Sequence, residues 1–270
     1  MNVTPLYNLS PLGSLLLLGG LLALGPVLWV GWRGRLATAF QRRQALRLFT
    51  LFLTFDLVLF GTFTRLTDSG LGCPDWPGCY GSTSPLGAGD LIGAAQQLLP
   101  DGPVTQAKAW IEMVHRYLAI GVGALITLLV VLAWRDSSGP RFTAGSPDRP
   151  TGLPQAGLSH VARRSQSGRW LAILTLFWVC LQGAFGALTV TMKLFPAIVT
   201  LHLLGALVLL TLLCLQLVWG AIEAGIPAPE LAAGTRRLLG WSFALLVLQV
   251  ALGGWVSANY AVLACSDFPT

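Results

Sequence analysis

Long apolar segments, separated by shorter polar ones, dominate the pattern of this chain. Six of them have the length that a membrane crossing needs, about 20 mostly apolar residues. Inside a bilayer, a lone segment satisfies its own backbone hydrogen bonds only as a helix. The pattern therefore predicts six transmembrane helices, at about residues 12–32, 48–66, 112–134, 170–190, 197–219 and 238–258.

The composition agrees with a membrane protein. Only 10% of the residues are charged and 54% are apolar, whereas a soluble domain typically carries about 25% charged residues. The first apolar segment, 12–32, has no basic residue before it and several after it, which is the reverse of a secretory signal peptide. We therefore expect this segment to stay in the membrane as a helix.

The net charge of +6 is distributed unevenly among the connections. Arginines gather in the first, third and fifth connections, whereas the second, at about 67–110, holds one Lys and four Asp. Because basic loops stay in the cytoplasm, we expect the N-terminus and the second connection on the outer side. This distribution favours a membrane topology over a patch that binds nucleic acid.

The third connection, 135–169, is rich in Ser, Gly, Pro and Arg. Such a composition predicts a flexible loop, which the charge pattern places in the cytoplasm. His160 lies in this segment and is expected to be solvated rather than to bind a ligand.

An internal repeat is visible in the spacing of two glycines and two cysteines. Gly61 precedes Cys73 by twelve residues, and Gly253 precedes Cys265 by the same number. The sequence around the second cysteine, ACSDFPT at 264–270, is a shorter copy of the sequence around the first. The pattern predicts a duplicated membrane protein, and we expect that only the opening of the second copy is present.

Cys73 and Cys79 are separated by the turn-forming sequence Pro-Asp-Trp-Pro-Gly. On the outer, oxidising side such a close pair favours a disulfide. Two roles stay open for it: a structural link that fastens the loop over the helix ends, or a redox-active pair that takes up electrons and passes them on. A zinc site is disfavoured, because no further Cys or His lies nearby to complete a tetrahedral set.

Two histidines lie inside predicted spans, where ionisable residues are rare and usually functional. His115 lies a few residues into its helix from the outer side, and His202 lies six residues after Pro196, which marks the start of another helix in the same direction. The two imidazoles are therefore expected at similar depths. This arrangement suits two axial ligands of one heme iron in a helix bundle, although each histidine alone is equally typical of an interhelical hydrogen bond.

Other polar residues accompany the histidines. Glu112 shares a helix face with His115, where a carboxylate can move protons or orient the imidazole; the alternative is an interfacial Glu favoured by the helix dipole. Arg65 and Arg116 lie at outer helix ends and either bind heme propionates or extend to lipid head groups. Gln182 lies in the middle of a span and needs a hydrogen-bond partner.

Four segments together resemble the heme A synthase family. They are TRLTDSGLGCPDWPGCYG at 64–81, IEMVHRY at 111–117, QGAFGALTV at 182–190 and PAIVTLHL at 196–203. The resemblance runs in order over about 48–270, and the cysteine loop and the Glu-x-x-His-Arg motif are specific in combination. The first predicted helix, 12–32, is not part of the common family core.

The resemblance implies an oxidoreductase of the bacterial inner membrane, with its cysteine loop on the periplasmic side. Such an enzyme oxidises a methyl group of heme O to the formyl group of heme A, which terminal oxidases need for assembly. Family members have two four-helix halves: the N-terminal half is thought to bind heme O as substrate, and the C-terminal half a heme b cofactor. The implied partners are heme O, the bilayer, heme O synthase and an electron donor.

The family's residues carry over to this chain by position. His115 and His202 match the N-terminal histidine pair that would bind the heme iron, Glu112 matches the acidic residue implicated in the reaction, and Cys73 and Cys79 match the first-loop cysteine pair. The helices that would carry the other two histidines are absent from the chain. We therefore expect a fragment, or one subunit of a split protein, and whether it turns over alone stays open.

On this basis we expect an all-α integral membrane protein in three parts. Residues 1–47 would form an extra transmembrane helix and a basic cytoplasmic loop, 48–222 the four-helix heme-binding bundle, and 223–270 the first helix of an incomplete second bundle. Two other functions stay open. A non-catalytic membrane cytochrome would only pass electrons through a bis-His heme, and a quinone-linked thiol oxidase would use Cys73 and Cys79 without needing the histidines.

Overall fold

The computed structural model describes residues 6–135, 155–227 and 229–261, and of residues 155–165 the backbone only. Within these ranges the regular structure is helical, apart from two isolated β-bridges. The helices are α1 (Leu12–Arg33), α2 (Ala39–Leu66), α3 (Gly89–Leu98), α4 (Gln106–Arg135), α5 (Gln155–Thr191), α6 (Pro196–Glu223) and α7 (Ala233–Ala258). All except α3 contain a span long and apolar enough to cross a membrane, which confirms the six predicted spans.

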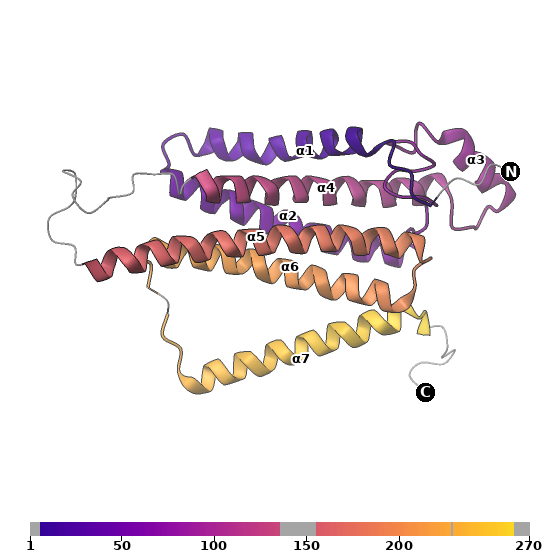
Figure 1. The fold of residues 1–270 in the computed structure, drawn as a ribbon. Helices are drawn as coiled ribbons and strands as arrows, with labels where there is room; N and C mark the ends of the chain where they lie inside the picture. The colour runs from indigo at the N-terminus through magenta and orange to yellow at the C-terminus, as the bar shows by residue number, and fades with distance from the viewer. Residues whose placement is uncertain (1–5, 136–154, 228, 262–270) are drawn as a thin grey trace.

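Helices α2, α4, α5 and α6 form a ring in which each helix packs against two others. Both α2 and α5 pack against α4 and α6, so α4 and α6 occupy opposite corners of the ring. Successive helices run in opposite directions, and therefore α4 and α6 run parallel (Figure 1). Helix α1 packs outside the ring, against α4 and α2. The ring is the four-helix bundle that the sequence predicts.

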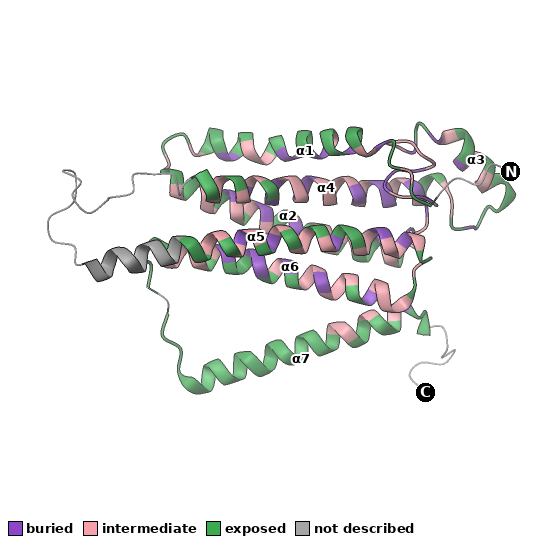
Figure 2. Ribbon diagram, viewed as in Figure 1, coloured by how far each residue is buried: buried purple, intermediate pink, exposed green. Residues whose placement is uncertain are grey.

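Two buried clusters support this arrangement, and Figure 2 shows the buried positions on the faces that the helices turn toward one another. The first lies within the bundle and includes Leu46, Leu125, Ile126 and Leu213. Lipid chains are as apolar as these side chains, so close packing rather than removal from water stabilises this cluster. The second cluster lies at the end of the bundle that carries the cysteine loop, which we call the cysteine end.

The helix boundaries differ most from the sequence prediction at two places. Helix α2 begins at Ala39 rather than near residue 48, because Thr38 and Gln41 form a capping box. The amide of Gln41 donates to Thr38 Oγ1 at 3.2 Å, and the amide of Thr38 donates to Gln41 Oε1 at 2.9 Å. This polar helical start carries no hydropathy signal.

The prediction of a loop over 135–169 is wrong for its second part. Helix α5 already begins at Gln155, so residues 155–169, including His160, are helical. These residues are mostly polar on all sides of the helix, and hydropathy therefore does not distinguish them from a loop. Helix α3 was not predicted either, since it is too short to span a membrane and lies in the second connection.

Helix α7 stands apart from most of the bundle and packs mainly against α6, at the cysteine end (Figure 1). None of its apolar span is buried. Close contact occurs at Gly254, where a methyl group would lie 3.0 Å from Leu203 Cδ2. Cys265 and the rest of the repeated sequence at 264–270 lie outside the described residues, so the predicted repeat stays a prediction.

Candidate functional site

The cysteine loop, residues 67–88, joins α2 to α3 and covers the end of the bundle. Its disulfide links Cys73 and Cys79, as predicted, and both cysteines are fully buried. They pack with Leu15 of α1, Ile92 of α3 and Met113 of α4 in the second buried cluster. Burying a large apolar side chain is worth about 1.5–3 kcal/mol, so the loop is a packed part of the fold.

Glu112 and Arg116 connect α4 to this loop. Glu112 is buried, and its Oε2 accepts the backbone N–H of Cys73 at 2.7 Å. Its other oxygen forms an ion pair with Arg116 Nη2, one helical turn further on. Glu112 thus faces the cysteine loop, and both of its carboxylate oxygens have partners.

Arg116 lies beneath the loop and binds its backbone. Its Nη1 donates to the carbonyl oxygens of Asp75 at 2.9 Å, of Pro77 at 3.2 Å and of Gly78. The guanidinium is buried together with the carboxylate of Glu112. A buried charge needs such partners, because its desolvation is otherwise costly. Arg116 therefore holds the loop in place, a role that sequence reasoning missed because backbone acceptors leave no mark in the sequence.

Asp75 is a second residue that sequence reasoning did not single out. Its side chain is buried and accepts the backbone N–H groups of Tyr80 at 2.6 Å and Gly81 at 2.7 Å. The signal was an Asp in a Pro- and Gly-rich turn, where Asp commonly binds backbone amides further along the chain. Gly72 completes the fit, since a methyl group there would lie 2.5 Å from the backbone of α4 at Lys108.

His115 lies one turn of α4 deeper than Glu112 and faces α2. Its ring stacks on Phe60, with 6.3 Å between the ring centroids. Its Nε2 rests against Gly61, where a methyl group would lie only 2.9 Å away. Gly61, which drew attention as part of the sequence repeat, is thus the residue that makes room for this imidazole.

His202 lies on α6, at the opposite corner of the ring from α4. Its Cε1 would lie 3.7 Å from a methyl group at Gly186 of α5, so this glycine also borders the imidazole. His115 and His202 therefore lie on parallel helices at opposite corners of the ring, both near the cysteine end.

Buried polar atoms without partners occur near His202. Among the described residues these include His202 Nδ1 and Gln182 Oε1. Most buried polar groups in proteins have hydrogen-bond partners, so these atoms mark a place where a partner is missing. No three His, Cys, Asp or Glu side chains of the described residues gather around a point that would suit a bare metal ion. Imidazole nitrogen is a common ligand of heme iron, so His115 and His202 are the residues that could hold such a group.

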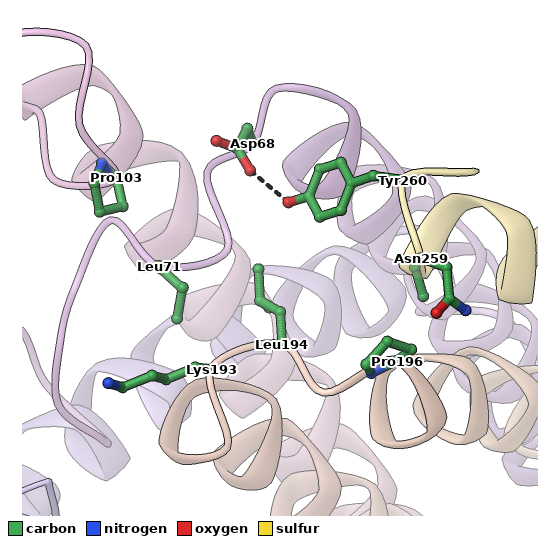
Figure 3. Close-up of a pocket in the computed structure, with 9 residues that line it drawn as sticks. Asp68, Leu71, Pro103, Lys193, Leu194, Pro196, Asn259 and Tyr260 are labelled. Atoms are coloured by element: carbon green, nitrogen blue, oxygen red, sulfur yellow. Dashed lines mark hydrogen bonds between the residues drawn. The ribbon is translucent and has the colours of Figure 1, made fainter. Parts of the chain in front are cut away.

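Arg65 lies at the cysteine end, apart from Arg116. Its Nη2 donates to the backbone oxygen of Ser257, and its guanidinium stacks on the ring of Tyr260 at 4.0 Å. Tyr260 in turn donates to Asp68 Oδ1 at 2.8 Å (Figure 3). These contacts join the end of α2 to the last turn of α7 and to the residues that follow it.

Beside this network lies a pocket of about 460 Å³. Figure 3 shows Leu71, Leu194 and the Asp68–Tyr260 pair around it. Asp68, Lys193, Leu194 and Tyr260 all line the pocket and all have a left-handed φ, between 51° and 58°. Strained residues of this kind persist where the surrounding structure holds them, and they concentrate at functional sites. The pocket lies near the start of α6, about 9 Å along the helix from His202.

Replacing Gly61 with Ala is expected to displace His115, because the new methyl group would lie 2.9 Å from Nε2 and both helices are packed there. We expect the variant to bind hemin at least tenfold more weakly than the parent chain, as measured by absorbance titration. Gly123→Ala on α4 is the matched control, since a methyl group there meets nothing within 4 Å. Equal affinity of the Gly61 variant and the parent would refute this role of Gly61.

Comparison with known proteins agrees with these features. The model of the COX15-CtaA family, described as cytochrome oxidase assembly protein, matches residues 44–270. Among curated proteins, the Heme A synthase of Shewanella oneidensis is 38% identical over 82% of this chain and 58% of its own length. The Heme A synthase of Halalkalibacterium halodurans is 26% identical over 84% of this chain and 64% of its own length. No solved structure matches the chain.

The chain spans only part of the length of these relatives. The matched part of this chain thus corresponds to about three fifths of the length of these two relatives. The family model nevertheless covers the ring of helices, except for the first five residues of α2, and the cysteine loop, together with α7. The chain therefore belongs to the COX15-CtaA family of cytochrome oxidase assembly proteins, which is the heme A synthase family that its motifs resemble.

Proposed function

We propose that this chain is the heme O-binding part of a heme A synthase, an oxidoreductase that converts a methyl group of heme O to the formyl group of heme A. The observation that carries the proposal is the pair His115 and His202, which lie on parallel helices at opposite corners of one bundle, near its cysteine end. The names of the relatives supply the reaction class.

In this proposal His115 of α4 and His202 of α6 would hold the substrate heme. The partnerless polar atoms beside His202 support a missing ligand at this place. Heme iron supplies the oxidising chemistry, and the chain's residues bind and orient the macrocycle. Glu112, one turn from His115, would orient that part of α4 and accept or donate a proton as the heme edge reacts.

Arg65 is the better placed of the two arginines to bind a heme carboxylate. It borders the Asp68–Tyr260 pair at the pocket, and a planar guanidinium pairs well with a carboxylate. Arg116 is already bound to Glu112 and to loop carbonyls. The propionate role considered for both arginines from the sequence is therefore proposed here for Arg65, with Arg116 as the anchor of the loop.

The geometry favours a structural role for the disulfide. Thiol–disulfide exchange needs access to a sulfur atom, and both cysteines are fully buried. A quinone-linked thiol oxidase is accordingly the weaker alternative. We propose that the disulfide keeps the cysteine loop in the shape that Arg116 and Glu112 bind.

The family suggests the membrane orientation and the partners of the enzyme. The charge pattern places the cysteine end on the periplasmic side of the inner membrane. Heme O synthase would supply the substrate, an electron donor would serve the reaction, and heme b would bind in a second histidine-containing half, of which α7 would be the first helix.

The product formed in cells tests this proposal. The chain is expressed in a host that makes heme O but lacks its own heme A synthase. The extracted hemes are separated by chromatography and identified by mass spectrometry. Heme A is expected above the level of a His115→Ala control, and Glu112→Gln is expected to retain heme O while losing the product. Bound heme O without heme A would make the chain a binding part that needs its other half. Heme b bound without preference for heme O would favour the non-catalytic cytochrome.

A further inference from the structure

Two buried glutamines lie between α5 and α6, and they differ in one respect. Gln216 is satisfied, because its Nε2 donates to Thr175 Oγ1 at 2.7 Å. Gln182 is equally enclosed, with 7% of its surface exposed, but its Oε1 has no partner. A buried polar atom without a partner costs about 1–3 kcal/mol. Gln182 Oε1 is therefore a buried acceptor that is available for a hydrogen bond.

The surroundings of Gln182 place this acceptor near His202. Trp178, Gln182 and Gly186 follow one another at four-residue intervals, so they form one face of α5. This face lies against α6: Trp178 Nε1 donates to the carbonyl of Gly205 at 2.7 Å, and Gly186 borders His202. Gln182 lies between these two contacts and crosses Gly205, where a methyl group would lie 2.0 Å from its Nε2.

His202 also has a buried nitrogen without a hydrogen-bond partner, its Nδ1. When an imidazole binds a metal through Nε2, the proton resides on Nδ1, and that N–H group donates to an acceptor which fixes the ring. The partnerless Thr200 Oγ1 is a less suitable acceptor, since Thr200 lies two residues before His202 on α6 and side chains two residues apart on a helix do not face each other.

We propose that Gln182 is a positioning residue for the heme ligand His202: its Oε1 accepts the Nδ1–H of His202 when Nε2 binds the iron. This hydrogen bond would fix the tautomer and orientation of His202 and increase the basicity of Nε2. The proposal rests on the proposed heme site and goes beyond it by assigning Gln182.

The test uses the full chain, purified in detergent and loaded with hemin. Gln182→Leu removes the acceptor and Gln182→Glu strengthens it, so the midpoint potential of the bound iron is expected to rise in the first variant and to fall in the second. The heme affinity of Gln182→Leu is expected to fall by about 10–100-fold. Gln216→Leu is the matched control, a buried glutamine on the same interface, and is expected to leave the potential unchanged.

A purely structural role would not move the potential in opposite directions in two variants of one site. Shifts in the same direction, or no shift, would overturn the proposal. If Gln182→Leu fails to fold, Gly205→Ala displaces the amide without changing Gln182 and must raise the potential as well, with Gly183→Ala as its control, since a methyl group there meets nothing within 4 Å. Absence of a bis-His spectrum in the parent chain would instead refute the proposed heme site, so the two failures are distinct.

Discussion

Arg116→Met is expected to lower the free energy of unfolding by about 3–5 kcal/mol, the usual cost of breaking a buried ion pair by removing one partner. The physical reason is that Glu112 stays buried and loses Arg116, its ion-pair partner among the described residues. The carbonyl groups of Asp75, Pro77 and Gly78 lose a donor at the same time. Equilibrium unfolding in mixed micelles, followed by tryptophan fluorescence, measures the change.

A double-mutant cycle separates the ion pair from the loop contacts. Glu112→Leu combined with Arg116→Met is expected to recover part of the loss, because the uncompensated charge is gone. Arg65→Met is the control, since Arg65 lies at the same end and its contacts are a backbone carbonyl and the face of a partly exposed Tyr260. It is expected to cost about 1 kcal/mol. Equal stability of Arg116→Met and the parent chain would contradict the anchoring role.

The sequence predicts the parts of this structure that depend on periodic or paired signals. Hydropathy reveals the spans, because lipid imposes a minimum apolar length on each. The short spacing of Cys73 and Cys79 predicts their disulfide, and the parallel directions of α4 and α6 put His115 and His202 near the same end of the bundle. Each of these signals is local, or depends only on the direction in which a helix runs.

The features that the sequence did not reveal depend on tertiary contacts. Arg116 binds main-chain carbonyls, and every residue has a carbonyl, so no side-chain pattern marks these acceptors. The polar starts of α2 and α5 extend beyond the apolar spans because capping and helix propensity continue where hydropathy ends. The sequence indicates that Gln182 needs a hydrogen-bond partner, but only the structure shows that His202 Nδ1 also lacks one.

The contacts of α4 connect the cysteine loop to the proposed heme site. Cys73 binds Glu112, Glu112 binds Arg116, and His115 lies between the last two residues on the same helix. A displaced loop would therefore move the part of α4 that carries the imidazole. This connection explains why the loop and the Glu-x-x-His-Arg motif occur together in the chain, although they are about 40 residues apart.

His115→Ala and His202→Ala are each expected to weaken hemin binding by more than the roughly 10–100-fold that loss of an outer-shell partner costs. Each variant would leave one axial imidazole, so the iron is expected to change from low spin to high spin. Absorbance and electron paramagnetic resonance spectra of the purified, hemin-loaded chain measure both effects. The variant lacking both histidines is expected to show no specific binding.

The third histidine supplies the control. His160 lies on α5, 26 residues before Gly186, which corresponds to about 39 Å along the helix. His160→Ala is therefore expected to retain the spectrum and affinity of the parent. A low-spin spectrum with unchanged affinity in either His115→Ala or His202→Ala would show that the iron takes that ligand from elsewhere. The heme would then not be held between α4 and α6, and neither Gly61 nor Gln182 would influence the midpoint potential of its iron.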